Sequence, residues 1–293
     1  MVTGESRPER RFILVTGLSG AGKSVVLNTL EDLGFYCIDN LPADLLRQLL
    51  MRRDHDQANV PDLVAVGIDA RNPAPGLANL PREFARLRED GVRMEVIFVE
   101  ANDEVLTRRF SETRRRHPLS AADIALPDAI ARERGLMAVL FEEADLCIDT
   151  SFTAVHELRD LVRQRIALRP AGSLSMQFVS FGYKHGTPRD ADFIFDTRCL
   201  PNPHWDKDLR RFSGRDQPVI DFLRAQPDVV LMLQDCRDFL DRWVPRFEAD
   251  NRSYLCVAFG CTGGHHRSVF MAEDLAGHFR ATGKHVMLKH RDL

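Results

Sequence analysis

The sequence lacks long apolar runs, closely spaced cysteines, internal repeats and low-complexity tracts. No stretch of its 293 residues approaches the roughly 18 uninterrupted apolar residues that a helix needs to cross a bilayer, and the first residues contain no apolar segment typical of a signal peptide. We therefore expect a cytoplasmic protein that does not contact a membrane. The six cysteines include no CxxC pair, which excludes a zinc ribbon and a thioredoxin-type motif.

The composition is that of a soluble globular chain, with 44% hydrophobic and 28% charged residues. The length predicts two domains. The formal charge of −3 is unevenly divided, because residues 1–155 carry 19 Lys/Arg and 25 Asp/Glu, whereas residues 156–293 carry 21 and 18. A polyanion should therefore bind the second half more readily than the first.

The first half alternates short apolar runs with helical patterns, which predicts an α/β fold with a mainly parallel sheet. Strands are expected at residues 11–17, 35–39, 63–69, 92–100 and 145–149. Helices are expected at residues 24–34, 43–50, 81–90, 102–115, 129–144 and 154–168.

A Pro-, Gly- and Ser-containing stretch at residues 169–175 predicts a domain boundary. We expect a nucleotide-binding domain at residues 1–168 and a second α/β domain at residues 169–293. In the second domain, strands are expected at residues 176–183, 192–196, 253–260 and 285–290, with two helices within 219–249 and one at 269–280.

A first phosphate-binding loop follows the first predicted strand and fits the pattern G-x-x-x-x-G-K-S. Its backbone N–H groups and the following helix N-terminus would surround the phosphates of ATP or GTP. Lys23 would reach the β- and γ-phosphates, and the Ser24 hydroxyl would bind magnesium. The loop consists of Gly17, Leu18, Ser19, Gly20, Ala21, Gly22, Lys23 and Ser24.

Two aspartates at strand ends are alternatives for a further contact with magnesium. Asp69 follows an apolar run and has the better sequence context. Asp39 is the alternative, and in kinase-like proteins that position often faces the acceptor substrate. Either residue could instead be an ordinary turn aspartate.

Three consecutive arginines, Arg114, Arg115 and Arg116, precede a His-Pro turn at the place where P-loop kinases carry a basic lid. Guanidinium groups suit phosphoryl oxygens. The alternative is a solvated helix end, where cations are favourable near the helix C-terminus.

A second loop, Cys261–Ser268, also lies between a predicted strand and a predicted helix. It matches C-x-x-G-x-x-R-S, the phosphate cradle of cysteine-dependent phosphatases. Its glycines let the backbone surround an anion, and Arg267 could donate two hydrogen bonds to it. We expect phosphate binding rather than thiolate catalysis, because no aspartate stands out as a general acid and a glycine precedes Cys261. A purely structural turn is the alternative.

Two weaker features complete the set. His204 and Trp205 lie in a turn-rich segment and could face a ligand or be buried. A sparse basic cluster near the C-terminus contains Lys284, Lys289 and Arg291, and is either a solvated surface or part of an RNA contact.

Taken together, these motifs resemble the RapZ/YvcJ family of bacterial nucleotide-binding proteins. The matching blocks are residues 15–24, 36–42, 69–72, 108–119, 200–205, 260–268 and 290–293. The resemblance implies a kinase-like P-loop domain that binds ATP and GTP, with Asp69, Ala70, Arg71 and Asn72 at the guanine-nucleotide position. It also implies a second domain that binds small RNA and senses glucosamine-6-phosphate through His204, Thr262, Gly263 and Arg267. Gly264 and Ser268 of the same loop complete the expected phosphosugar site.

In enterobacterial members of this family, the protein presents a small RNA to the endoribonuclease RNase E and so controls amino-sugar synthesis. The resemblance therefore implies a regulatory RNase adapter, a homo-oligomer based on trimers, with slow ATP or GTP hydrolysis as its only chemistry. A small-molecule phosphotransferase or a cysteine-dependent phosphatase is the competing hypothesis. Enterobacterial members continue past the final HRDL block with a further Lys- and Arg-rich run that contributes to RNA binding.

Overall fold

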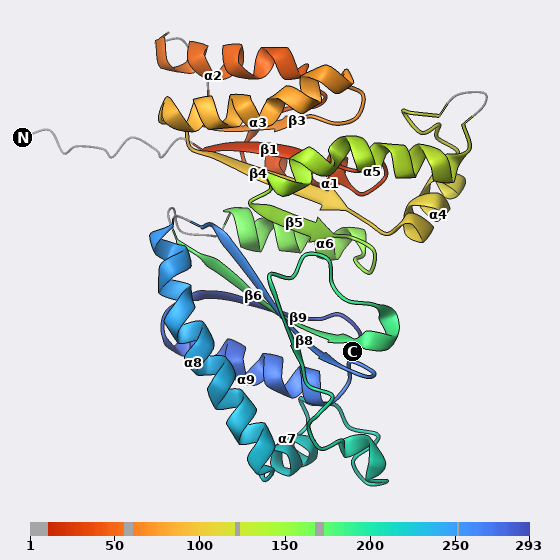
Figure 1. The fold of residues 1–293 in the computed structure, drawn as a ribbon, viewed down its shortest axis with the longest axis vertical. Coiled ribbons are helices and arrows are strands. Elements are labelled where there is room, and N and C mark those ends of the chain that lie inside the picture. Colours follow the sequence, from red (N-terminus) through yellow and green to blue (C-terminus); the bar gives the residue numbers. More distant parts are fainter. Residues whose placement is uncertain (1–10, 56–60, 121–123, 168–172, 251) are drawn as a thin grey trace, which may run out of the picture. The chain divides into compact units, whose positions relative to one another are not determined.

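The computed structural model describes residues 11–55, 61–120, 124–167, 173–250 and 252–293. The chain divides into two compact units, Met1–Leu168 and Arg169–Leu293. Each is an α/β structure whose described strands pair in parallel, as the alternating strand and helix patterns predict (Figure 1).

The first unit has a five-stranded parallel sheet of order β2-β3-β1-β4-β5. Its strands are β1 (Arg11–Gly17), β2 (Tyr36–Ile38), β3 (Leu63–Gly67), β4 (Met94–Glu100) and β5 (Leu146–Asp149). Strands covered on both faces read as continuous apolar runs, and β1 is buried from Phe12 to Gly17. The chain crosses from one side of β1 to the other, so the loop after β1 lies at a topological switch point, where open α/β sheets bind ligands.

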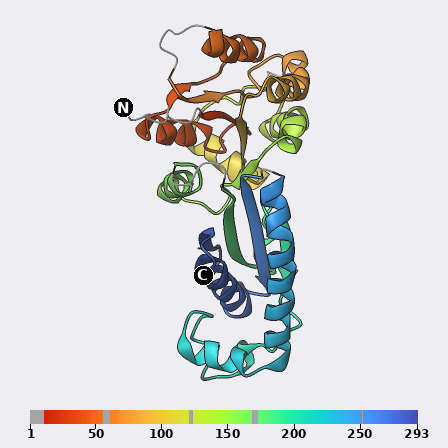
Figure 2. The same ribbon diagram turned by 90° about the vertical axis from the view of Figure 1, so that its left-hand side faces the viewer.

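Helices pack against both faces of this sheet, with α1 beside α6 on one face and α3 beside α5 on the other (Figures 1 and 2). The helices are α1 (Lys23–Asp32), α2 (Leu46–His55), α3 (Ala74–Glu89), α4 (Asp103–Thr113), α5 (Leu126–Glu142) and α6 (Val155–Val162). A 3-10 turn, η1 (Ala43–Leu45), precedes α2, and a π-helical turn, η2 (Arg163–Ala167), follows α6.

One helix begins well before its predicted start. We expected a helix from Pro81, but α3 begins at Ala74 and contains Pro81. Leu77 and Leu80 are buried with Phe84 and Leu87, so the apolar stripe extends N-terminally past the proline. Burial of that stripe stabilises the extra turns despite the hydrogen bond that proline removes.

The second unit has a four-stranded parallel sheet of order β7-β8-β6-β9. Its strands are β6 (Ser175–Gly182), β7 (Phe193–Asp196), β8 (Tyr254–Cys261) and β9 (His285–His290). Its helices are α7 (Gln217–Arg224), α8 (Pro227–Ala249) and α9 (Arg267–Ala281), with 3-10 turns η3 (Tyr183–His185) and η4 (Pro203–Trp205).

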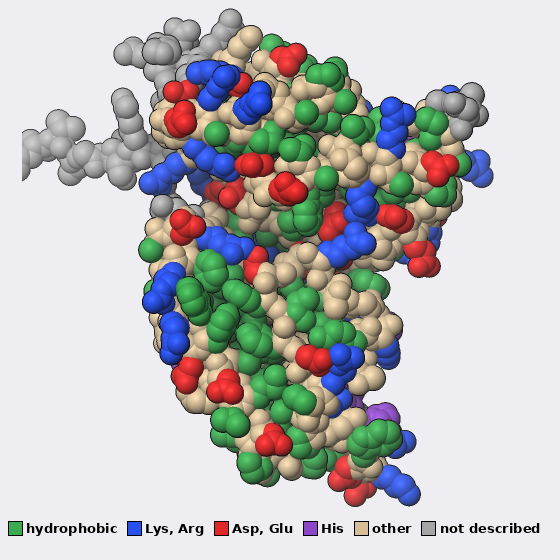
Figure 3. All heavy atoms as spheres, in the orientation of Figure 1, with side chains coloured by type: hydrophobic (Ala, Val, Ile, Leu, Met, Phe, Trp, Pro, Cys, Tyr) green, Lys and Arg blue, Asp and Glu red, His purple; other side chains and the backbone are tan. Residues whose placement is uncertain are grey.

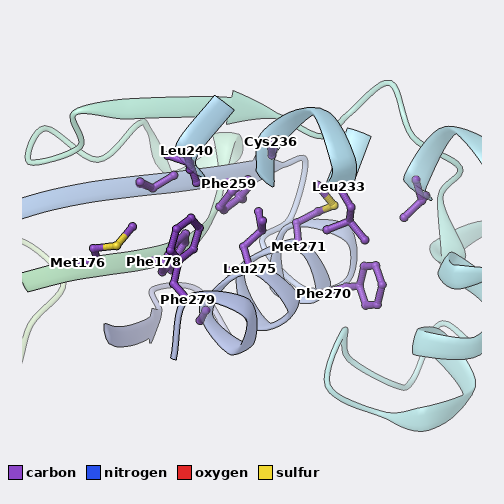
Figure 4. Packing of buried hydrophobic residues seen from close by; sticks show 14 of the residues in the cluster. Met176, Phe178, Leu233, Cys236, Leu240, Phe259, Phe270, Met271, Leu275 and Phe279 are labelled. Carbon is purple, nitrogen blue, oxygen red and sulfur yellow. The ribbon is translucent and has the colours of Figure 1, made fainter. Parts of the chain in front are cut away.

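Alternate residues of β6 and β8 enter different clusters on the two faces of this sheet. Phe178 and Phe259 join the larger cluster, which includes Leu240 of α8 and Phe279 of α9 (Figure 4). The phenylalanines stack, with ring centroids 5.7 Å apart for Phe178 and Phe279. This packing fixes the carboxyl end of β8, from which the second loop leaves.

Candidate functional site

The first loop, Gly17–Ser24, connects β1 to α1 as the sequence predicts. Gly17 has φ +127°, and a Cβ at this position would lie 2.0 Å from the carbonyl oxygen of Val99. Gly22 also has a positive φ and precedes the first residue of α1. The first N–H groups of a helix have no partner within it, so the N-terminus of α1 offers donors where the loop ends.

Lys23 places a cation within the first loop. Its Nζ donates to the carbonyl oxygens of Gly17 at 2.8 Å and Leu18 at 2.9 Å, and lies 3.8 Å from Asp69 Oδ2. Burial lowers the pKa of Lys23, although the carboxylates of Asp69 and Glu133 act in the opposite direction. The side chain is therefore held beside the position that an anionic phosphate would take.

The two alternative aspartates differ in burial and distance. The side chain of Asp69 is 6% exposed and that of Asp39 is 61% exposed. Burial alone would raise the pKa of Asp69, but hydrogen bonds from Arg71 and the charge of Lys23 lower it overall. Asp69 is thus an ionised carboxylate beside Lys23, and Ser24 is exposed in the first turn of α1.

The segment Asp69–Asn72 forms a compact turn after β3. Arg71 donates from its backbone N–H and its guanidinium to the Asp69 carboxylate. Asn72 is buried, and its Oδ1 accepts from the Ala43 backbone N–H at 2.8 Å. The amide of Asn72 is therefore engaged internally, Ala70 is buried, and Arg71 is the exposed member of the segment. The guanine-nucleotide contact stays a prediction.

The arginine segment, Arg114–Arg116, follows α4 and is exposed. Arg114 has φ 52°, a left-handed conformation that ends the helix and turns the chain. The next residue, His117, is buried. The role of these arginines as a phosphate lid stays a prediction.

Sequence reasoning missed two groups that contact the first loop. Arg109 of α4 donates to the Gly20 carbonyl at 3.1 Å and to the Thr150 carbonyl at 2.8 Å. Thr150 in turn donates to the Ala21 carbonyl at 2.7 Å. Glu133 of α5 accepts from the Ser19 backbone N–H at 3.0 Å. Arg109 lies in the block 108–119, but no motif indicates that these residues contact the loop, because their partners in the loop are 88 or more positions away along the chain.

The second loop surrounds the sulfur of Cys261. Gly264 donates its N–H to Sγ at 3.2 Å, and the Ser268 hydroxyl lies 3.2 Å from Sγ. Burial alone would raise the pKa of Cys261, but hydrogen bonds from Ser268, Gly264 and His265 lower it overall. The loop therefore stabilises negative charge on its own cysteine.

Arg267 has internal partners that its motif does not predict. The residue is 5% exposed and its NH1 donates to the carbonyls of Arg198 at 2.8 Å and Leu200 at 2.9 Å, while its expected contact with an anion in the loop stays a prediction. These carbonyls lie in the loop after β7 and need a donor, which the buried guanidinium supplies. Its Nε has no hydrogen-bond partner among the described residues.

The other residues of the expected phosphosugar site gather near the second loop. Thr262 is exposed, Gly263 is partly exposed and Gly264 is buried. The ring of exposed His204 lies 6.2 Å from that of His266. Burial lowers the pKa of His266 to about 4, so this ring is neutral near pH 7.

Cations in the expected basic cluster already contact other groups of the protein, so they are less available to bind RNA than the sequence suggested. The Nζ of Lys284 lies 2.7 Å from each carboxylate oxygen of Glu248. The side chain of Arg291 is only 7% exposed and donates to the carbonyls of Gly182 and Gly186. Lys289 is partly exposed on β9. The expectation of a solvated surface is therefore wrong for Arg291, which instead ties the chain end to β6.

Within the parts of the chain that the structure describes, no three His, Cys, Asp or Glu side chains form a group that could hold a metal ion. Across the same residues, no helix is both long and apolar enough to cross a membrane.

Comparison with known proteins finds relatives for both units. Residues 11–169 match the family model of the RapZ-like N-terminal domain, and residues 174–293 match that of the RapZ C-terminal domain. A nucleotide-binding protein of Alkalilimnicola ehrlichii is 52% identical over 97% of this chain and 98% of that protein. One of Methylococcus capsulatus is 48% identical over 97% of this chain and 96% of that protein.

Among solved structures, the shikimate kinase of Acinetobacter baumannii in complex with shikimate is similar to 54% of this chain and 93% of that chain. The identity is 20% and the TM-score 0.36. A deoxyadenosine kinase of M. mycoides is similar to 54% of this chain and 98% of that chain, with 12% identity and a TM-score of 0.32.

Proposed function

The chain belongs to the RapZ family, and we propose on that premise that its first unit binds ATP or GTP with magnesium through Gly17–Ser24. The relatives are named nucleotide-binding proteins. The observation that carries the proposal is Lys23, held on the loop carbonyls at the N-terminus of α1 with Asp69 3.8 Å away. Beneath the loop, the Thr16 hydroxyl is buried without a hydrogen-bond partner among the described residues.

Magnesium fits the residues present if nucleotide phosphates complete its coordination. Mg²⁺ in such sites takes one or two protein oxygens and otherwise phosphates and water. Exposed Ser24 directly follows Lys23 in α1, and the ionised Asp69 carboxylate lies 3.8 Å from the Lys23 Nζ, so these are the two side-chain oxygens that would hold the metal. The metal would supply charge neutralisation between the β- and γ-phosphates.

Hydrolysis at this site should be slow. A general base works best when its pKa lies near the working pH. Hydrogen bonds from Arg71 and the charge of Lys23 lower the pKa of Asp69 and keep it ionised, and as a ligand of magnesium it would not be free to accept a proton from water. We therefore propose a regulatory nucleotide switch with at most slow ATPase or GTPase activity.

Calorimetry on the full chain with Mg-ATP and Mg-GTP tests the proposal. Lys23→Ala should weaken binding by at least about tenfold, or roughly 1.4 kcal/mol, because the cation beside the phosphates is lost. Lys207→Ala in the second unit is the matched control and should bind as wild type does. Equal affinity of wild type and Lys23→Ala would refute the assignment of this loop.

We extend the proposal to a phosphosugar, glucosamine-6-phosphate, bound at the second loop with His204, Thr262, Gly263, Gly264, Arg267 and Ser268. Two buried polar atoms of this loop, Arg267 Nε and His266 Nε2, have no hydrogen-bond partner among the described residues. Orphaned buried groups of this kind favour a ligand or an ordered water that completes them.

We further propose that the protein is a cytoplasmic RNase adapter. It would bind a small regulatory RNA through Lys284, Lys289 and Arg291 and present it to an RNase E-type endoribonuclease, so controlling amino-sugar synthesis. Of these three, Arg291 would have to leave its internal contacts to reach RNA. Sequencing RNA that co-purifies with the full chain tests this; recovery of no specific RNA would contradict it.

A trimer-based homo-oligomer is the proposed assembly. The second unit exposes large apolar side chains, and Figure 3 shows hydrophobic side chains gathered on its visible face. Exposed apolar patches favour protein contacts. The exposed apolar residues of this unit include Ile194, Trp205, Val230, Leu231 and Trp243. Sedimentation equilibrium tests the assembly, and a monomer at micromolar concentration would contradict it.

One observation favours a second candidate function, a cysteine-dependent phosphatase. The lowered pKa of Cys261 is what a thiolate nucleophile needs. Cys261→Ser should leave glucosamine-6-phosphate binding nearly intact if the loop is a receptor. Wild-type hydrolysis of an aryl phosphate that disappears in Cys261→Ser would instead establish the phosphatase.

A further inference from the structure

A buried carboxylate holds the apex of the first loop. Glu133 of α5 has a fully buried side chain, as does its neighbour His117. Glu133 accepts from the Ser19 backbone N–H at 3.0 Å, from the Ser19 hydroxyl at 2.7 Å and from His117 Nε2 at 2.9 Å. One carboxylate thus joins the phosphate loop to the residue that follows the arginine segment.

The hydrogen bonds of His117 define its tautomer. The Leu119 backbone N–H donates to Nδ1 at 3.1 Å, so Nδ1 is an acceptor and the ring hydrogen lies on Nε2. Nε2 therefore donates to Glu133, which accepts three hydrogen bonds and donates none, as an ionised carboxylate does. The charge of Glu133 also favours the charged form of Lys23.

His117 also contacts Phe110, a second side chain that packs against the first loop. The left-handed turn at Arg114 lets the chain return, and the His117 ring lies 5.1 Å from that of Phe110. Phe110 covers Gly20, where a Cβ would lie 3.2 Å from its ring. His117 therefore sits between two side chains that each contact the apex of the first loop.

We propose that Glu133 and His117 are positioning residues that hold the arginine segment and the first loop in one arrangement, so that Arg115 and Arg116 strengthen nucleotide binding only while the His117–Glu133 hydrogen bond is present. A buried carboxylate that loses a donor is costly, so the alternatives to this arrangement are few. The inference rests on the proposed nucleotide binding and concerns how that site is assembled.

The test compares the effect of the arginines in two backgrounds. Mg-ATP binding to the full chain is measured by calorimetry for wild type and for Arg115→Ala/Arg116→Ala, each with and without His117→Phe. Phenylalanine keeps a ring beside Phe110 but cannot donate to Glu133. We expect the arginine substitutions to weaken binding at least tenfold with His117 present and less than twofold with His117→Phe.

A conservative variant of His117 and a matched arginine control distinguish a positioning role of His117 from a role in folding alone. His117→Gln, whose amide can donate to Glu133, should restore most of the arginine effect. Arg108→Ala removes an exposed cation of α4, whose guanidinium lies 4.0 Å from the Glu112 carboxylate, and should change affinity equally in both backgrounds. If His117→Phe does not fold, His117→Leu, whose side chain also cannot donate to Glu133, takes its place in the same comparison.

The possible results distinguish failure of the positioning role from failure of the nucleotide site. An arginine effect of equal size in both backgrounds overturns the inference, and so does the absence of any arginine effect in wild type. Lys23→Ala keeps the two proposals apart: if it abolishes binding while the arginine effect is independent of His117, only the positioning role fails. If Lys23→Ala binds as wild type does, the proposed nucleotide site itself fails.

Discussion

The two loops have the same local arrangement of strand, loop and helix, but their charged side chains contact different groups. Each follows a buried parallel strand and precedes a helix. In the first, Lys23 lies on the loop carbonyls beside Asp69, so the loop contains a cation close to the helix N-terminus. In the second, Gly264 and Ser268 contact the sulfur of Cys261, while Arg267 donates to carbonyls outside the loop.

This difference shows that the same strand–loop–helix arrangement can surround different charged groups. A strand, a glycine-containing loop and a helix create a place where an anion is stabilised. In the first loop, that position is open to an anionic ligand, and Lys23 supplies a cation beside it. In the second loop, the cysteine sulfur takes part of the stabilisation, which is why its pKa is lowered.

The largest expected effect is a loss of stability from Gly17→Ala. The new Cβ would lie 2.0 Å from the Val99 carbonyl at φ +127°, so the first unit should lose about 3 kcal/mol or more through strain and overpacking. The matched change in the second loop, Gly263→Ala, meets nothing within 4 Å and should cost under about 1 kcal/mol. Urea unfolding followed by hydrogen exchange of β1 and β8 peptides measures each unit. A wild-type midpoint for Gly17→Ala would contradict the crowding argument.

The next largest effect is a pH dependence of the stability of the second unit. The pKa of His266 is about 4 when folded, against about 6.5 unfolded. As pH falls between these values, the unfolded chain gains a proton that the folded chain does not, so up to about 3 kcal/mol of stability present above pH 6.5 is lost. Both tryptophans, Trp205 and Trp243, lie in this unit, so their fluorescence reports its unfolding in urea.

His266→Gln provides the control for this pH dependence. It should flatten part of the loss between about pH 6.5 and 4, since glutamine does not titrate. Burial also lowers the pKa of His290, which acts in the same direction and should persist in the variant. An unchanged pH profile in His266→Gln would show that this ring does not cause the effect.

A smaller effect concerns the thiolate of the second loop. The difference in ultraviolet thiolate absorbance between wild type and Cys261→Ser should titrate below the usual thiol range, because the loop lowers the pKa of Cys261. Cys236, whose pKa burial raises to about 12, is the internal contrast. Ser268→Ala removes the strongest lowering contact and should raise the pKa of Cys261. No change in that variant would assign the stabilisation to the backbone alone.

The smallest effect is expected at Lys284. Its ion pair with Glu248 is part-exposed, so Lys284→Ala should cost under about 1 kcal/mol of stability. If Lys284 contacts an RNA phosphate, the slope of log affinity against log salt should fall by about 0.7–0.9 in the variant. Filter binding at several salt concentrations measures this, and an unchanged slope would exclude Lys284 from the RNA contact.

Much of the fold followed from patterns in the sequence. The strands begin and end within three residues of the predicted ranges, and both loops lie between a strand and a helix as expected. The start of α3 was missed, because Pro81 is typical of a helix start and the buried Leu77 and Leu80 precede it. Such boundaries depend on packing, which overrides local propensity.

The sequence by itself determined the parallel α/β character of both units and the positions of Gly17–Ser24 and Cys261–Ser268, because these depend on local periodicity and on glycines at turns. Tertiary structure alone decided what each charged side chain contacts. Glu133 meets Ser19 across 114 positions, and Arg267 meets Arg198 across 69. Hydrogen bonds to buried charges depend on distances that only the packed strands and helices establish, so no local pattern records them.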